Sequence, residues 1–106
     1  MIEITNNTQN EASDFVKTRA KHCSCVKVGN GEYRVSPMTY GFELHRDKTK
    51  RRVRFLMMDD RVWAICRDWY DGSPCDANLH GRHCCHVIAA LKRFTTSVTR
   101  ELRRVA

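Results

Sequence analysis

Four of the six cysteines and three of the five histidines fall in one polar stretch, residues 63–91 of a 106-residue chain. Three thiols and one imidazole in it have the spacing Cys-x8-Cys-x8-Cys-x-His, and they are Cys66, Cys75, Cys84 and His86. Three thiolates and an imidazole are typical of a closed, tetrahedral zinc site. Free cysteines can instead be small buried apolar residues, but clustering with histidines in a polar loop favours metal. The sequence therefore predicts one structural Zn²⁺ ion.

The end of this stretch resembles a known family. Cys84-Cys85-His86-Val87-Ile88-Ala89-Ala90 is similar to the Cys-x-His-apolar-apolar-Ala ending of SWIM zinc fingers. Cys66-Arg67-Asp68-Trp69 resembles the second half of that family's Cys-x-Cys-x-Asp-aromatic opening. Ala64 stands where the family has its first cysteine and cannot bind metal, so Cys75 is taken as the replacement. The resemblance implies a β-hairpin and a helix around zinc, and a role in binding nucleic acid or protein.

Other side chains could supply the fourth ligand instead of Cys75. Cys23-Ser24-Cys25 offers a Cys-x-Cys pair, although about sixty residues before Cys84, and the remaining candidates are Cys85, His80 and His83. Cys85 lies between two predicted ligands, so we expect it to point away from the metal and to tolerate Ser or Lys. His80 and His83 are otherwise interpreted as polar loop residues.

The formal charge of +7 is unevenly distributed. Residues 1–43 hold five basic and five acidic side chains, residues 44–82 nine and six, and residues 83–106 five and one. Such asymmetry indicates an anionic partner. The candidates for binding nucleic acid are basic residues of one turn and of the last helix, with one aromatic that could stack on a base: Arg46, Lys48, Lys50, Arg51, Arg52, Arg54, Lys92, Arg93, Arg100, Arg103, Arg104 and Trp69.

The predicted function is therefore a small zinc-binding module that binds nucleic acid, DNA more than RNA, mainly through phosphates. The alternative is an adaptor for a transposase, recombination or ATPase partner. The basic turn could then be a solvated hairpin tip, and Trp69 could pack on the zinc knuckle. No His-Glu-x-x-His, phosphate loop, Cys-x-x-Cys or deaminase signature is present, so we do not expect an enzyme.

Length and hydropathy indicate a single domain, residues 1–106, with its zinc knuckle at about 63–91. No apolar run approaches a membrane span, and the first residues do not resemble a signal peptide, so a cytoplasmic or nuclear protein without a membrane partner is expected. Six cysteines there suggest metal rather than disulfides. No small-molecule substrate is indicated.

The periodicity predicts an α+β fold: an N-terminal helix on an antiparallel sheet of four or five strands, then the zinc knuckle and a C-terminal helix. The first ten residues are expected to be frayed, and a helix over 11–22 to cover the sheet with Phe15 and Val16. A hairpin over 24–35 should place Val26 and Val28 inward. The remaining elements are strands at 40–45, 51–58 and 61–66 and a helix at 86–104.

Overall fold

A computed structural model describes residues 1–37, 50–75, 77 and 80–105, with the backbone alone for residue 37 and for the last helix beyond residue 95. Within this part of the chain, five strands form one antiparallel sheet in the order β1-β5-β4-β3-β2. The strands are β1 (Ile2–Ile4), β2 (Cys23–Gly29), β3 (Glu32–Pro37), β4 (Arg51–Met58) and β5 (Arg61–Asp68). The fold is α+β, as predicted; the strand expected at 40–45 lies outside the described residues.

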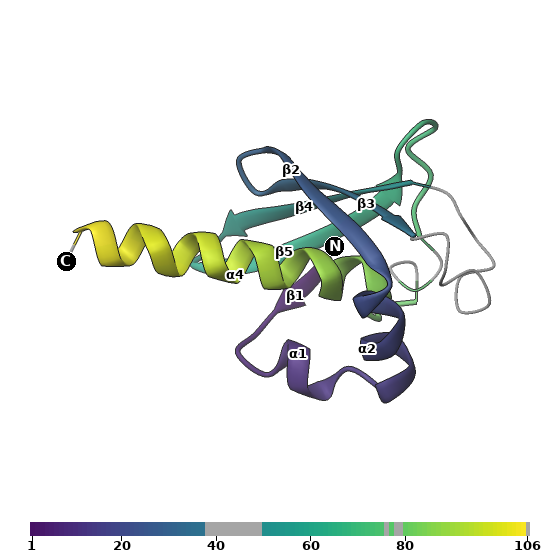
Figure 1. The fold of residues 1–106 in the computed structure, drawn as a ribbon, viewed down its shortest axis with the longest axis horizontal. Coiled ribbons are helices and arrows are strands. Elements are labelled where there is room, and N and C mark those ends of the chain that lie inside the picture. Colours follow the sequence, from purple (N-terminus) through teal and green to yellow (C-terminus); the bar gives the residue numbers. More distant parts are fainter. Residues whose placement is uncertain (38–49, 76, 78–79, 106) are drawn as a thin grey trace.

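The long helix α4 (Cys85–Val105) lies along one face of the sheet (Figure 1). The sheet contributes Tyr33, Val35 and Val53 to the core at no more than 1% exposure, and the helix contributes Val87 at 0%. Phe55 packs between the two layers, edge-on to Tyr33 at 5.9 Å and stacked on Phe94 at 4.6 Å between ring centroids. The core therefore depends on the position of α4, which begins at the cysteine-rich loop.

The N-terminus is ordered by the sheet, and the prediction that it is frayed is wrong. Ile2 pairs with Ala64 and Ile4 with Val62, so β1 is an edge strand beside β5. The side chain of His83 donates a hydrogen bond from Nε2 to the carbonyl oxygen of Glu3 at 3.0 Å. This pairing is long-range, which is why no local pattern in the first residues indicated it.

Two short helices follow, α1 (Thr8–Glu11) and α2 (Asp14–Lys21). Ser13 caps α2, since its Oγ accepts a hydrogen bond from the Val16 N–H at 3.2 Å. The helix packs mainly against α4 and not on the sheet, and Phe15 is 61% exposed. The expectation that Phe15 covers the sheet is therefore wrong, although Val16 does pack against the core.

The β2–β3 hairpin forms as predicted, but the side chains of β2 face opposite ways from the expectation. Cys25 pairs with the fully buried Val35, and residues directly opposite share a face of the sheet. Val26 and Val28 consequently point to the other face and are 46% and 44% exposed. β2 is an edge strand, and in such a strand the positions of the apolar residues do not reliably indicate which face is buried.

Two turns complete the sheet. Asp59 and Asp60 connect β4 to β5 with φ of 53° and 59°, and Gly31 in the β2–β3 turn has φ of 65°. A Cβ atom at Gly31 would stand 2.9 Å from the carbonyl oxygen of Phe55, so this position needs glycine for both conformation and space. No helix among the described residues is both long and apolar enough to cross a membrane.

Candidate metal centre

The end of one strand, a tight loop and the start of a helix position the four predicted ligands. Cys66 lies near the end of β5, and the Cys75 N–H donates to the Cys66 carbonyl oxygen at 3.1 Å, which brings the two side chains together. Cys84 immediately precedes α4, where its carbonyl accepts the Ile88 N–H at 3.2 Å. His86 lies in the first turn of that helix.

Asp68 shapes the loop between Cys66 and Cys75. Its Oδ1 accepts the backbone N–H groups of Tyr70 at 2.9 Å and Asp71 at 3.0 Å. Its own N–H donates to the Ser73 carbonyl at 2.8 Å, which returns the chain beside β5. Asp68 therefore closes a turn that carries Cys75 back to Cys66.

The ligand atoms of Cys66, Cys75, Cys84 and His86 all lie within 4.8 Å of one another, and all four residues are buried. Zinc–sulfur bonds of about 2.3 Å in a tetrahedron separate the ligand atoms by roughly 3.8 Å. Only a small contraction would be needed for one ion to contact all four. The structure thus brings together the set of residues predicted from the sequence and forms a possible metal site.

The imidazole of His86 also fits a metal. Its Nε2 atom is buried without a hydrogen-bond partner, while Nδ1 lies 3.9 Å from the Sγ atom of Cys85. Buried polar atoms are normally satisfied, so a buried ring nitrogen without a partner needs an explanation. A metal ion at one ring nitrogen of a histidine, with the other nitrogen held by a neighbour, is a common arrangement.

The thiols compete for protons. Contacts with Cys75 and Cys84 raise the pKa of Cys66, whereas contacts with Cys66 and Cys84 lower the pKa of Cys75. Burial disfavours the charged form of His86, but contacts with the Cys75 and Cys84 sulfurs outweigh it and raise the His86 pKa to about 11. The cluster therefore stabilises a thiolate next to a positively charged group. A divalent cation can supply this positive charge in place of the protons.

The alternative ligands lie outside this cluster. The thiol of Cys85 is not part of the cluster, although its Sγ lies 3.9 Å from Nδ1 of His86, and contact with Cys23 lowers its pKa to about 4. The side chain is only 4% exposed, so the expectation that Lys is tolerated there is wrong. The thiol of Cys23 donates to the Arg19 carbonyl at 3.5 Å. His83 holds β1, as described above, and His80 is exposed.

The predicted nucleic-acid residues do not form one group. Lys50, Lys92 and Arg93 are exposed, and Arg93 donates to the Cys25 carbonyl at 2.8 Å. Arg51 was expected beside Arg52 and Arg54, but it lines a cavity next to the metal cluster. The reason is strand alternation, because Arg51 shares a face with the buried Val53. The other predicted nucleic-acid residues lie outside the described side chains, and they are Arg46, Lys48, Arg100, Arg103 and Arg104.

Two arginines that were not predicted, Arg34 and Arg67, lie near Arg52 on the outer face, which is the sheet surface opposite α4. Arg34 pairs with Arg52, and Arg52 pairs with Arg67, so three guanidinium groups lie in one row across β3, β4 and β5. Trp69 lies beside this row, with the Arg52 guanidinium 4.3 Å and that of Arg34 5.8 Å from its ring centroid. The arginines at alternating strand positions were visible in the sequence, but their alignment depends on register.

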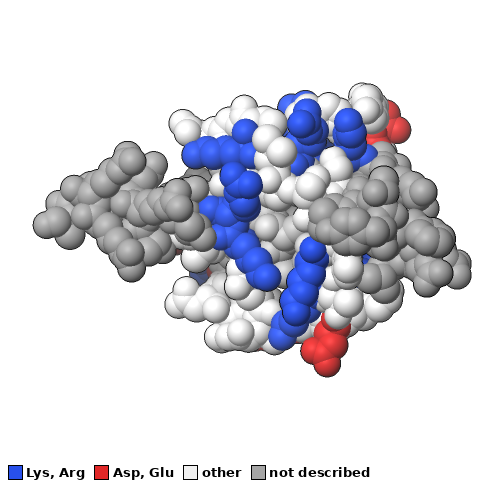
Figure 2. Space-filling view, in the orientation of Figure 1, with Lys and Arg blue, Asp and Glu red and all other residues white. Residues whose placement is uncertain are grey.

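Acidic side chains neutralise this face only in part. Glu32 accepts a hydrogen bond from Arg52 at 2.8 Å, and Arg54 and Arg67 are exposed. Figure 2 shows basic side chains spread over the middle of the side seen in Figure 1, with acidic ones only near its margins. Positive charge is therefore not confined to one surface.

The chain matches no protein-family model, no curated protein and no solved structure.

Proposed function

We propose that this chain is a zinc-binding module in which Cys66, Cys75, Cys84 and His86 hold one structural Zn²⁺ ion. The observation that supports it is the convergence of three buried thiols and one ring nitrogen of the buried His86, all within 4.8 Å of one another. Cysteine and histidine together favour zinc over magnesium or calcium, which prefer oxygen ligands. Four protein ligands leave no open position on the metal, so the proposed role is structural and not catalytic.

The arrangement around this cluster also supports the proposed likeness to SWIM zinc fingers. Cys66 lies near the end of a hairpin strand, and Cys84 and His86 lie at the start of a helix, which is the order that the resemblance implies. In this proposal Cys75 takes the place of the missing first cysteine at position 64.

A ligand series tests the metal site. Zinc content per chain is measured for Cys75→Ser and, as the matched control, for Cys85→Ser, since both cysteines are buried but only the first belongs to the cluster. We expect about one zinc ion per chain in the wild type and in the control, and a large loss of zinc in Cys75→Ser. Full zinc retention by Cys75→Ser contradicts the assignment of the fourth ligand.

We further propose that the module binds nucleic acid, DNA more than RNA, mainly through phosphates on the outer face. Like charges directly opposite on neighbouring strands destabilise a sheet, so the row of Arg34, Arg52 and Arg67 lowers the stability of the free protein. A polyanion laid across the row would relieve this repulsion and release counterions. The Trp69 ring beside the row could contact a base edge or sugar.

Salt-dependent binding of single- and double-stranded DNA and RNA tests this function. Arg54→Gln with Arg67→Gln removes two exposed charges from the outer face and leaves the Arg52–Glu32 pair intact. Lys21→Gln with Lys27→Gln is the control, with the same change in charge at exposed sites elsewhere. Two lost phosphate contacts should lower the slope of log affinity against log salt by roughly 1.4 to 1.8, on every sequence tested.

Equal slopes for the outer-face variant and its control would contradict this face as the interface. Absence of binding to any nucleic acid at low salt would favour the adaptor function instead. An apolar protein interface depends only weakly on ionic strength, so the same titration separates the two functions.

A further inference from the structure

The outer face of the sheet carries both tryptophans of the chain as well as the row of arginines. Along β5, Trp63, Ile65 and Arg67 alternate with buried residues and therefore lie on the outer face. Trp69 continues the alternation, because its N–H donates to the Lys50 carbonyl oxygen at 2.9 Å and extends the pairing of β5 with β4 by one residue. Since the chain has two tryptophans, every indole ring lies on this face.

The register divides the outer face into a basic part and an apolar part. The basic part is the row of three arginines on β3, β4 and β5, with Arg54 beside it. In the apolar part Leu56 pairs with Trp63, and Ile65 pairs with Arg54 at the boundary. These apolar side chains are partly exposed, since α4 packs on the other face. The outer face thus offers cations and apolar surface side by side.

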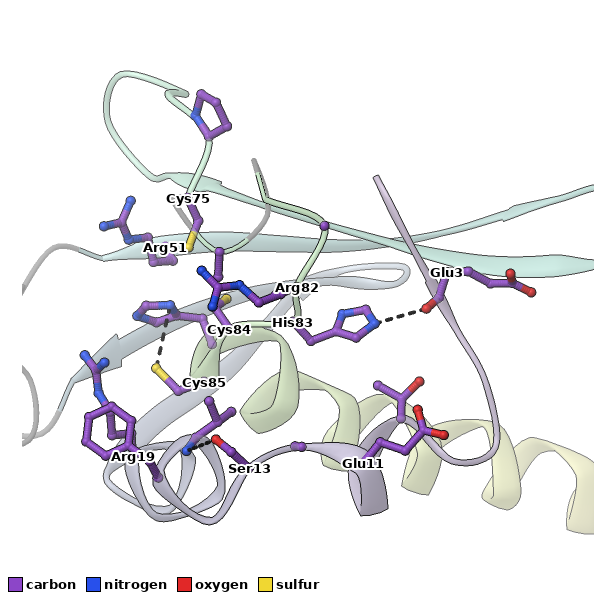
Figure 3. A pocket seen from close by; sticks show the side chains of 18 of the residues that line it. Glu3, Glu11, Ser13, Arg19, Arg51, Cys75, Arg82, His83, Cys84 and Cys85 are labelled. Carbon is purple, nitrogen blue, oxygen red and sulfur yellow. Dashed lines mark hydrogen bonds between the residues drawn. The ribbon is translucent and has the colours of Figure 1, made fainter.

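Acidic side chains leave most of the basic part without a counter-charge. Glu32 is bound to Arg52 at 2.8 Å, whereas the Glu3 carboxylate lies 3.8 Å from Arg61 at the other end of the face. The Glu3 carbonyl oxygen accepts the His83 hydrogen bond on the α4 side, and the Glu3 side chain points away from His83 (Figure 3). The two aspartates of the β4–β5 turn lie beyond the apolar part. Positive charge is therefore concentrated at the row of arginines.

Two consecutive aromatic residues border this row. Trp69 stands against the Arg52 guanidinium, which lies 4.3 Å from its ring centroid. Tyr70 is 75% exposed, so most of its ring is open to solvent. Its backbone is nevertheless held, because Asp68 Oδ1 accepts the Tyr70 N–H at 2.9 Å. An exposed ring on an ordered turn offers a stacking surface at a small cost in conformational entropy.

We propose that the outer face binds single-stranded DNA in preference to duplex DNA, with phosphates on the row of arginines and unpaired bases stacked on Tyr70 and on the Trp69–Arg52 pair. This inference rests on the proposed nucleic-acid function and names its substrate class. Aromatic rings and guanidinium planes both stack on unpaired bases. In a duplex the faces of the bases are covered by their neighbours, so the aromatic and apolar side chains of the outer face would meet charged backbone instead.

Charge and length both fit a single strand. The row of arginines selects a polyanion over an apolar protein surface by charge complementarity. Trp63 and Trp69 lie roughly 20 Å apart along the extended chain of β5, a length that about six nucleotides span at the helical spacing of about 3.4 Å. Phosphate contacts alone would favour the duplex, because its charge density is higher. Preference for the single strand therefore reports stacking.

The test titrates zinc-loaded full-length protein with a single-stranded DNA of mixed sequence and with the duplex of the same length. Tyr70→Leu removes the exposed ring and should weaken binding of the single strand by about five- to a hundredfold, with duplex binding and zinc content unchanged. Tyr70→Phe keeps the ring and should bind like the wild type. Phe15→Leu is the matched control, because it removes an aromatic ring that is 61% exposed on α2, and it should leave both affinities unchanged.

Tryptophan fluorescence gives a second readout, since both indoles lie on the outer face. Trp63→Phe leaves Trp69 as the only emitter, and stacked bases should quench its emission more with the single strand than with the duplex.

Salt-dependent binding that is as tight for the duplex as for the single strand, with no loss in Tyr70→Leu, overturns this inference and leaves the phosphate-binding function standing. Equal losses for the two forms in Tyr70→Leu also overturn it, because the ring would then act through the fold and not through stacking. Absence of binding to either form at low salt overturns the inference together with the nucleic-acid function.

Discussion

Removal of zinc should unfold this domain almost completely. The four proposed ligands join the end of β5 to the start of α4, and that helix supplies Val87, Ile88, Ala90 and Leu91 to the core. A domain of this length has a total stability of roughly 5–16 kcal/mol. Structural zinc contributes on the order of 10 kcal/mol or more in small modules. The two quantities are comparable, so little net stability remains without the ion.

Circular dichroism melts with and without a chelator measure this effect. A loss of 1 kcal/mol lowers the melting temperature of a domain near 100 residues by about 4–8 °C. Even half of the expected zinc contribution would therefore lower it by tens of degrees. Re-addition of zinc should restore the helical signal, which separates metal loss from irreversible damage. A metal-free protein that melts within a few degrees of the zinc-loaded one would refute the reasoning, because the apolar core alone would then suffice.

Substitutions at three further positions, Gly31, Phe55 and Cys85, test the packing around the site by denaturant unfolding of zinc-loaded protein. Gly31→Ala should destabilise the fold more than Gly72→Ala. Both positions have positive φ, which costs an alanine about 1–2 kcal/mol, but only at Gly31 would the new Cβ meet a backbone atom, the Phe55 carbonyl oxygen at 2.9 Å. Equal losses of stability would contradict the contact with Phe55. Phe55→Ala should cost about 3–5 kcal/mol, since its ring joins sheet to helix, and a cost below about 1 kcal/mol would contradict that packing. Cys85→Ser should keep zinc with a small loss of stability, whereas Cys85→Lys should fold poorly because the side chain is 4% exposed; normal folding of the Lys variant would contradict its buried position.

The convergence of the cysteine and histidine ligands was predictable because its information is local in the sequence. Cys66, Cys75, Cys84 and His86 are chemically distinctive and span about twenty residues, so a strand, a tight loop and a helix start suffice to bring them together. The hairpins were predictable for the same reason, from turn residues such as Asp59 and Gly31.

Features that depend on register or on distant pairing were not predictable. The side to which Val26 points depends on its position in an edge strand, and the pairing of Ile2 with Ala64 leaves no periodic signal near either residue. The row of Arg34, Arg52 and Arg67 exists only because β3, β4 and β5 align in one register. Side chains alternate along a strand, so Arg51 should share the buried face of Val53. Its positive charge nevertheless led to the prediction that it lies with Arg52 and Arg54.

The position of β1 at the edge beside β5 has a consequence for how the protein is made. During translation Ile2 is made long before its partner Ala64, and the His83 side chain that holds the Glu3 carbonyl is made later still. Contacts this distant along the chain form slowly, because a long loop must close first. Strand β1 should therefore be among the last elements to pair, and it should become protected from proteolysis only after the cysteine-rich loop has emerged.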